Sequence, residues 1–286
     1  MHTMTNTEMY GNVRQIISDL TGIQIGSDKE YLIPARLSGL LSKYRISSFD
    51  DLARSAQENA IPGLKDDFIE QVSTHETTFF RDESTFTAIS AQILPEWILR
   101  NEHERPKLRI WSMACSTGQE PYSLAMLIHR KHPALFENME ILATDVSRLS
   151  VQHASAGLYN SYSVGRGLPE EYLSRYFRKA GDNHQVSEEI RRVIKFDTLN
   201  LLAEGYPGGW DIVLCRNVLF YFDMPLRKKI LERIRQALSP DGVLILGSAE
   251  SVDGFLDQYI IRECGLARYY EIKSSRVTFP ATKKEK

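Results

Sequence analysis

From Leu108 onward, short apolar runs alternate with amphipathic segments, and this alternation restricts the fold more than any other feature of the chain. The runs LRIWSM, EILATD, RRVIKFD, WDIVLCRN and VLILGS predict strands. Segments such as YSLAMLIHRK and PLRKKILERIRQALSPDG predict helices between them, and QYIIRECGLARYYEIK predicts a closing hairpin. Strands that alternate with helices form a parallel, doubly wound sheet. We therefore expect an α/β domain over residues 86–286.

The alternation is interrupted between Gly157 and about Ile190. The stretch GLYNSYSVGRGL gathers Tyr, Gly and Ser residues and shows neither the helical nor the strand pattern. We interpret residues 157–191 as an insertion that forms a small subdomain.

Residues 1–85 contain no convincing strand. NVRQIISDLTGI and YLIPARLSGLLSKYRI place apolar residues at three- and four-residue spacings, and SSFDDLARSAQEN begins with serine caps. With KDDFIEQVS they predict a small helical N-terminal domain. The basic residues of its second helical segment leave two interpretations open, a docking surface or a solvated polar face; they are Lys29, Arg36, Lys43 and Arg45.

Composition limits the possible partners and the compartment. A formal net charge of −2 over 286 residues provides no global field for nucleic acid or a membrane surface, so we expect neither as a partner. No apolar run approaches the roughly 18 residues of a membrane span, and MHTMTNTEMYGNVRQ lacks the apolar core of a signal peptide. The three cysteines lie far apart and form no C-x-x-C pair, which argues against disulfides. We expect a cytoplasmic monomer.

The stretch STHETTFFRDEST at residues 73–85 suggests two local interpretations. His75-Glu76 resembles the start of the zinc motif H-E-x-x-H, but Phe79 stands where the second histidine ligand must be, so we expect no metal. The remaining local interpretation is a helix start with Ser73, Thr74 or Asp82 as cap and the phenylalanines in the core.

In an open parallel sheet, ligands bind beyond the carboxyl ends of the strands. The first strand ends in ACSTG, whose small residues let a ligand approach a helix N-terminus. With a single glycine, Gly118, this turn is not the dinucleotide motif G-x-G-x-x-G. Asp145 ends the second strand, where a carboxylate accepts hydrogen bonds from ribose hydroxyls, although it could instead cap the next helix.

Glu120 distinguishes between adenosine cofactors. At the start of a helix its carboxylate would repel a phosphate and attract a cation. S-adenosylmethionine carries an ammonium and a sulfonium and no phosphate, so the sequence favours it over a pyrophosphate cofactor. A hydrolase alternative would use Ser116 as nucleophile, because ACSTG resembles G-x-S-x-G; it lacks the late histidine that such enzymes need, since none follows His184.

Several ordered strings together resemble one family. THETTFFR, WSMACSTGQEPYSLA, ATDVS, the LNLL of FDTLNLL and CRNVLFYF occur in this order over nearly the whole chain. They are similar to those of the CheR chemotaxis-receptor methyltransferases, which methylate receptor glutamates with S-adenosylmethionine. The resemblance implies a small helical N-terminal domain that docks on the receptor, joined to a Rossmann-like class I methyltransferase domain with an inserted antiparallel β-subdomain.

The resemblance also implies the residues of the cofactor site. Glu120 would bind the methionine ammonium and Asp145 the ribose, while this chain has His75 where the family often has asparagine. The cofactor-binding residues are expected to be His75, Thr77, Arg81, Glu120, Asp145, Asn200, Leu201, Asn217 and Val218.

The expected reaction needs no general base, because a glutamate with a pKa of about 4.3 is already ionised near neutral pH. Arg81 is our candidate for aiming the substrate carboxylate and Tyr221 for donating a hydrogen bond; the structural alternatives are a helix-end charge and core packing. The implied partner is the cytoplasmic helical bundle of a methyl-accepting chemoreceptor. RKAGDNHQVSEEIRR looks short for the hairpin that grips a receptor tether peptide, so we expect no tether binding.

Two other classes remain open. A nucleotide-binding oxidoreductase would need a pyrophosphate cradle, which Gly118 alone does not supply. A non-catalytic adaptor that senses the cofactor would keep Asp145 but would not need Arg81.

Overall fold

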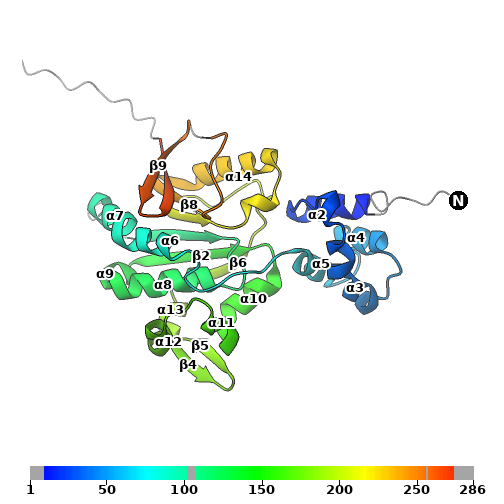
Figure 1. Ribbon diagram of the computed structural model, residues 1–286, viewed down its shortest axis with the longest axis horizontal. Coiled ribbons are helices and arrows are strands. Elements are labelled where there is room, and N and C mark those ends of the chain that lie inside the picture. Colours follow the sequence, from blue (N-terminus) through cyan, green and yellow to red (C-terminus); the bar gives the residue numbers. More distant parts are fainter. Residues whose placement is uncertain (1–9, 102–106, 256, 274–286) are drawn as a thin grey trace, which may run out of the picture.

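The computed structural model describes residues 10–101, 107–255 and 257–273. Figure 1 shows a helical bundle beside a larger domain built on a twisted sheet, with an extended segment running between them. Within the described ranges, no helix combines the length and apolar character that crossing a membrane requires.

The N-terminal bundle has its own core, which confirms the expected helical domain. Apolar residues at helical spacing, among them Ile17, Leu37 and Phe68, are fully buried in it. Ser48 accepts a hydrogen bond from the Asp51 amide (3.1 Å), as the serine-cap pattern predicts. The helices are α2 (Gly11–Thr21), the short η1 (Ser27–Lys29), α3 (Leu32–Tyr44), α4 (Phe49–Gln57) and α5 (Leu64–Val72).

Two of the basic residues considered for docking are engaged within the described chain. Arg36 donates to the carbonyl of Ser73 (3.2 Å) and to the hydroxyl of Thr74 (3.1 Å), and Lys43 forms an ion pair with Asp67. Arg36 and Lys43 therefore stabilise the bundle and its exit segment, a role that neither sequence interpretation foresaw.

The larger domain is built on a sheet of strand order β6-β2-β1-β7-β8-β10-β9. The first five strands in this order pair in parallel, and β10 pairs antiparallel with both β8 and β9. This confirms the α/β prediction and the closing hairpin. The strands are β1 (Leu108–Met113), β2 (Met139–Asp145), β6 (Ile194–Thr198), β7 (Trp210–Cys215), β8 (Leu238–Leu246), β9 (Tyr259–Cys264) and β10 (Ala267–Ile272).

Both faces of the sheet are buried, because successive side chains of a strand point to opposite faces. Ile212 and Leu214 of β7 belong to the core that includes α8, whereas Val213 and Cys215 belong to the core under α14. Figure 1 shows α14 and α8 on opposite sides of the sheet. The helices are α6 (Glu83–Ala88), the π-helical turn η2 (Ile89–Ile93), α7 (Leu94–Asn101), α8 (Gln119–Lys131), α9 (Pro133–Phe136), α10 (Arg148–Ala156), η3 (Leu219–Tyr221) and α14 (Met224–Ala237).

The break in the alternation is a small subdomain, as expected. Its antiparallel sheet has the order β3-β5-β4, and it lies at the bottom of Figure 1, away from the N-terminal bundle. Its elements are β3 (Leu158–Asn160), α11 (Ser161–Gly165), α12 (Glu170–Tyr176), β4 (Phe177–Ala180), β5 (Asn183–Val186) and α13 (Glu188–Arg191).

Residues 73–82, here called the connecting segment, join the two domains. The helix start expected within 73–85 is correct only from Glu83; Asp82 precedes α6, but its side chain makes no capping hydrogen bond. The bundle core ends at Val72, and Phe86 belongs to the sheet core. We therefore keep the division at residue 85 as a proposal, with the connecting segment in contact with both sides.

The connecting segment is anchored by Phe79. Its ring is fully buried and packs edge-on against Tyr159 (5.1 Å between centroids) and Phe177 (5.7 Å). Gly167 lies against the backbone of Phe79, so closely that a Cβ at this position would stand 2.2 Å from the Phe79 carbonyl oxygen. Only glycine fits this contact.

We expect Phe79→Ala to lower the free energy of unfolding by about 3–5 kcal/mol, since it leaves a cavity beside the rings of Tyr159 and Phe177. Denaturant unfolding measures this loss. The matched control is Phe220→Ala, at a side chain that is 46% exposed, where a change within about 1 kcal/mol is expected. Equal losses at both positions would contradict the anchoring role.

Candidate functional site

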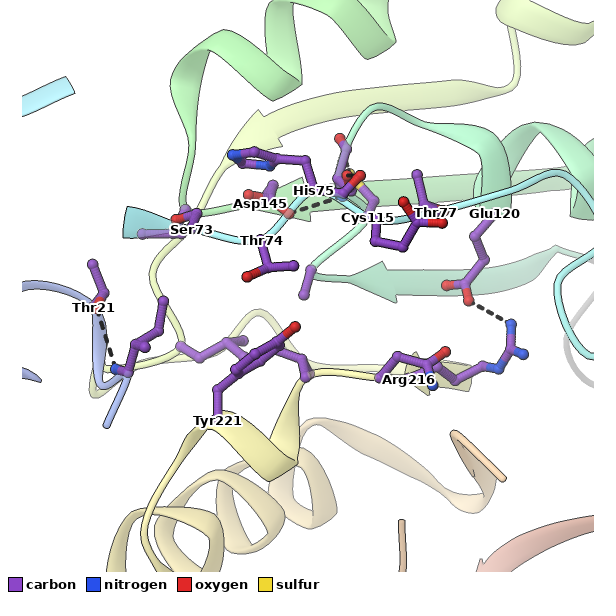
Figure 2. Close-up of a pocket in the computed structure, with 18 of the residues that line it drawn as sticks. Thr21, Ser73, Thr74, His75, Thr77, Cys115, Glu120, Asp145, Arg216 and Tyr221 are labelled. Atoms are coloured by element: carbon purple, nitrogen blue, oxygen red, sulfur yellow. Dashed lines mark hydrogen bonds and ion pairs between the residues drawn. The ribbon is translucent and has the colours of Figure 1, made fainter. Parts of the chain in front are cut away.

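The main pocket lies where β1, β2 and β7 end, beneath the connecting segment (Figure 2). Its lining includes every residue that the sequence singled out as catalytic or cofactor-binding. They are His75, Thr77, Arg81, Glu120, Asp145, Asn200, Leu201, Asn217, Val218 and Tyr221. The structure brings all of them together, while their contacts with a cofactor stay predictions.

Parallel pairing explains the gathering. β1 pairs with β2 on one side and β7 on the other, so the three strands end at the same edge. The strand order reverses direction at β1, and crossovers leave a crevice at such a point. The residues that follow each strand therefore line a common space.

Asp145 closes β2 as a buried carboxylate. One oxygen accepts the Ser116 amide (2.8 Å) and the other the Ser147 amide (2.9 Å). Burial raises the pKa of Asp145, and these two amides and the nearby His75 oppose that rise. The helix cap is instead Ser147, which accepts from the Ser150 amide (3.0 Å). Because a carboxylate has about four lone-pair positions, Asp145 keeps capacity for two further donors.

Strained backbone concentrates at this edge. Five of the seven non-glycine residues with positive φ in the described chain lie in the pocket wall or on either side of Arg81. Such conformations cost of order 1–3 kcal/mol each and persist only where the surroundings enforce them. They are Ala114 (φ 51°), Ser116 (51°), Asn217 (58°), Phe80 (50°) and Asp82 (60°).

Glu120 lies at the opposite end of the pocket from Thr21 in Figure 2. Its carboxylate accepts from the Ser112 hydroxyl (2.8 Å) and forms an ion pair with Arg216 (2.8 Å). The Arg216 side chain is 1% exposed. A charge so deep in the protein is tolerated only when it is paired.

Arg216 is paired with carboxylates, whereas Arg81, within the described chain, is not. Arg216 also pairs with Asp82 (2.9 Å) and donates to the backbone carbonyl of Arg81 (2.7 Å). Arg81 donates to the Glu76 carbonyl (3.0 Å), and among the described residues no carboxylate forms an ion pair with it. Arg81 is therefore the cation of the pocket that remains open to an anion.

Glu250 holds the loop after β7. One carboxylate oxygen accepts the amides of Asn217 (2.7 Å) and Gly247 (2.8 Å), and the other accepts those of Val218 (2.9 Å) and Leu219 (2.7 Å). Four donors use all of its lone-pair positions. Glu250 is therefore an anchor for the backbone and has no capacity left for a ligand.

The N-terminal domain reaches the pocket from its far side. The side-chain amide of Asn200 donates to the Leu20 carbonyl (2.7 Å), and the backbone amide of Gln24 donates to the Tyr221 carbonyl (2.8 Å). Thr21 and Ile23, between these contacts, line the pocket. Figure 2 shows the Tyr221 ring rising from η3 into the space between the walls.

His75, the departure from the family pattern, has both ring nitrogens occupied. Nδ1 lies 3.0 Å from the Ser150 hydroxyl, and Nε2 lies 3.1 Å from the Glu70 carbonyl. The ring thus ties the connecting segment to α10 and α5. Its predicted contact with the cofactor stays a prediction.

Among the described residues that line the pocket, Ser116 and Cys115 are two nucleophile candidates, and neither is activated. The Ser116 hydroxyl donates to the backbone carbonyl of His75 (3.3 Å) instead of to an imidazole, so the hydrolase alternative lacks its nucleophile–base pair. Burial raises the pKa of the Cys115 thiol well above its usual range, which keeps that side chain neutral.

Sequence reasoning missed Arg216, Glu250, Thr21 and Ile23. A charged residue directly after the apolar run DIVLC, and an acid just after VLILGS, were signals available for the first two. Thr21 and Ile23 left no local signal, because only the docking of α2 on the catalytic domain brings them to the pocket.

The lining suits a zwitterionic nucleoside. Carboxylates stand at two separate places in the pocket, and Arg216 is neutralised by its partners. The turn at Gly118 provides one glycine and no cluster of cations for a pyrophosphate. A ribose, an adenine and an ammonium group match the available acceptors better than phosphate groups do.

Comparisons with known proteins agree with this geometry. Residues 8–73 match the family model "CheR methyltransferase, all-alpha domain", and residues 75–266 match "CheR methyltransferase, SAM binding domain". The chain is 36% identical to chemotaxis protein methyltransferase 1 of Vibrio cholerae over 92% of this chain and 96% of that protein. It is 38% identical to chemotaxis protein methyltransferase 1 of Pseudomonas aeruginosa over 91% and 96%.

We expect Glu250→Gln to lower the free energy of unfolding by about 2–6 kcal/mol, because the glutamine NH₂ would face two backbone donors at about 1–3 kcal/mol each. Denaturant unfolding measures the loss, and hydrogen exchange should show lost protection at the amides of residues 217–219. Glu263→Gln, at a carboxylate that is 67% exposed, is the control. Unchanged exchange in Glu250→Gln would refute the anchor.

Proposed function

The chain belongs to the CheR methyltransferase family, and on that premise we propose that it methylates glutamate side chains of chemoreceptor cytoplasmic domains, giving glutamate methyl esters and S-adenosylhomocysteine. It is a methyltransferase that uses S-adenosylmethionine, as the sequence predicted. The glutamate substrate, the residue roles and the receptor partner are the proposal.

The cofactor would be held at two carboxylates. Asp145, with capacity for two further donors, would accept the ribose hydroxyls, and Glu120 would accept the ammonium group. Asn200 and Leu201 would border the adenine side, and Asn217 and Val218 would contact the cofactor beside the end of β7. When bound, S-adenosylmethionine supplies a methyl group made electrophilic by its sulfonium.

The chemistry of a carboxylate acceptor fits this pocket. A glutamate side chain with a pKa of about 4.3 needs no base to become a nucleophile at neutral pH. The one histidine among the described lining residues, His75, has both ring nitrogens occupied by Ser150 and by the carbonyl of Glu70, whose carboxylate also lies 3.4 Å from Nε2, so it is not free to act as a base on a substrate. Attack by an anion on a cation neutralises charge, so exclusion of water by the connecting segment favours the reaction.

The observation that carries the proposal is the open charge of Arg81. Its guanidinium has donors available in a fixed plane, which suits a carboxylate, while the Arg216 guanidinium is already paired with Glu120 and Asp82. Arg81 would aim the substrate oxygen along the line of transfer. Tyr221, which also lines the pocket, would donate its hydroxyl to the second carboxylate oxygen.

The receptor's cytoplasmic helical bundle is the proposed partner, and the cytoplasm the proposed compartment. Lys43 is paired with Asp67, whereas Arg36 donates to uncharged groups and keeps its positive charge, so Arg36 is the better candidate of the two for receptor docking. The hairpin of β4 and β5 spans residues 177–186. We keep the expectation that it binds no receptor tether peptide, and that the chain is a monomer.

Incubation with S-adenosylmethionine labelled in its methyl group and a panel of receptor cytoplasmic domains tests the function. Base-labile label on receptor glutamates is expected, since methyl esters hydrolyse in alkali. Cofactor binding without label on any acceptor would favour the non-catalytic adaptor. Label on lysine or another acceptor would refute glutamate methylation.

We expect Arg81→Ala to slow single-turnover methyl transfer by about 100-fold, the scale of a misaligned reacting group. Binding of S-adenosylhomocysteine, measured by calorimetry, should change by less than about fivefold, because Arg81 acts on the acceptor. Arg192→Ala, at a surface arginine paired with Glu137, is the control. Wild-type turnover in Arg81→Ala would remove Arg81 from the mechanism.

We expect Asp145→Asn to show the opposite pattern, with S-adenosylhomocysteine binding weakened about 10–100-fold, as for lost hydrogen bonds to a charged group at 1.5–3 kcal/mol. Calorimetry measures the affinity. Asp197→Asn is the matched control, because Asp197 lies near the end of the neighbouring strand β6 but is 58% exposed and outside the pocket lining. Retained affinity in Asp145→Asn would exclude the ribose contact.

A further inference from the structure

Arg216 lies between the cofactor end and the acceptor end of the site. One nitrogen, Nη1, binds Glu120, and the adjacent Nη2 binds both Asp82 and the backbone carbonyl of Arg81. The Phe86 ring lies 5.8 Å from the guanidinium carbon and packs against it. A single buried side chain thus contacts the group proposed to bind the ammonium and the backbone that carries Arg81.

The charges of this cluster do not balance by themselves. Glu120 and Asp82 contribute two negative charges and Arg216 one positive charge, which leaves one excess negative charge around a side chain that is 1% exposed. An ammonium group bound by Glu120 would bring the sum to zero. Without Arg216, two neighbouring carboxylates would share a poorly solvated space, and the pKa of one of them would rise.

We propose that Arg216 is a positioning residue that keeps Glu120 ionised for the ammonium group of the cofactor and fixes the backbone beneath Arg81. The inference rests on the proposed roles of Glu120 and Arg81. Arg216 itself needs no contact with the substrate, because it acts through these two neighbours.

The groups around Glu120 and Asp82 determine which side chains could titrate in a variant that lacks Arg216. Glu120 is approached by the Ser112 hydroxyl, by Arg216 and by the thiols of Cys115 and Cys215, whose pKa values burial raises well above their usual range. On its other side the cluster borders Arg81, which precedes Asp82 in the chain. Between about pH 6 and about pH 8, the carboxylates alone would titrate in a variant without Arg216.

The test compares Arg216→Gln with Arg216→Lys by calorimetry of S-adenosylhomocysteine binding. Arg216→Gln keeps a polar side chain without charge, and we expect about tenfold weaker binding near pH 7. Relative to wild type at the same pH, this loss should be larger near pH 6 and smaller near pH 8, because the raised pKa leaves Glu120 protonated in acid. Arg216→Lys keeps the charge, so its ratio to wild type should be independent of pH.

Asp82→Asn provides a rescue. In the Arg216→Gln background it removes the competing carboxylate, so it should restore several-fold of the lost affinity and abolish the pH dependence of the ratio. Arg216→Lys should still slow single-turnover methyl transfer more than it weakens binding, since one ammonium cannot hold Glu120, Asp82 and the Arg81 carbonyl together.

A loss of affinity in Arg216→Gln that is independent of pH, or that Asp82→Asn leaves unchanged, would overturn the proposal. If Arg216→Gln does not fold, the double variant with Asp82→Asn is compared with Arg216→Lys; a double variant that also fails to fold would give Arg216 a purely structural role. Since binding is the readout, a wild-type protein that binds S-adenosylhomocysteine but methylates no receptor domain would refute the proposed function and leave this test intact.

Discussion

The parallel pairing of β1 with both β2 and β7 is the constraint on which the rest of the site depends. It brings the turn at Gly118, the carboxylate of Asp145 and the guanidinium of Arg216 to one edge, although they lie far apart in the sequence. Crossovers that begin at this edge leave their helices on both faces, so the crevice stays open to ligands. The small residues of the turn, the strained backbone and the single glycine then decide which ligand can approach.

Three buried or half-buried acids surround the pocket, and hydrogen bonding separates their roles. Glu250 accepts four backbone amides and is saturated, so it can only hold the loop after β7. Asp145 accepts two amides and keeps room for two hydroxyl donors. Glu120 accepts from one serine and pairs with one arginine, and on the proposed function it would also receive the cationic group of the cofactor. The number of hydrogen-bond donors that a carboxylate already accepts therefore separates a structural acid from one able to bind a ligand more clearly than its burial does.

Much of the architecture could be predicted from the sequence, because it follows from local patterns. The alternating apolar runs predicted the strands of the sheet, and the break after Gly157 predicted the subdomain. The serine pattern predicted the helix cap at Ser48. The pocket residues that could be predicted lie at strand ends, such as Asp145, or in the strings that resemble one family. The helix start near Ser73 was wrong because Phe79 is buried against Tyr159 and Phe177 and the chain turns there, with positive φ at Phe80 and Asp82, so that the helix begins only at Glu83. The contact of Phe79 joins residues about 80 to 100 apart in the chain, which no local pattern reveals.

The position of the N-terminal domain links its docking to the cofactor. Two hydrogen bonds, from the Asn200 side chain to the Leu20 carbonyl and from the Gln24 backbone amide to the Tyr221 carbonyl, place Thr21 and Ile23 in the pocket wall. A ligand that contacts this wall binds the docked arrangement more tightly than a separated one, and by linkage it stabilises the docking by the same free energy. Glu70 of α5, bonded to the Ser147 hydroxyl that begins α10, extends the same interface to the loop that follows Asp145. If the proposed cofactor occupies this pocket, the helical domain would therefore contribute part of its binding site.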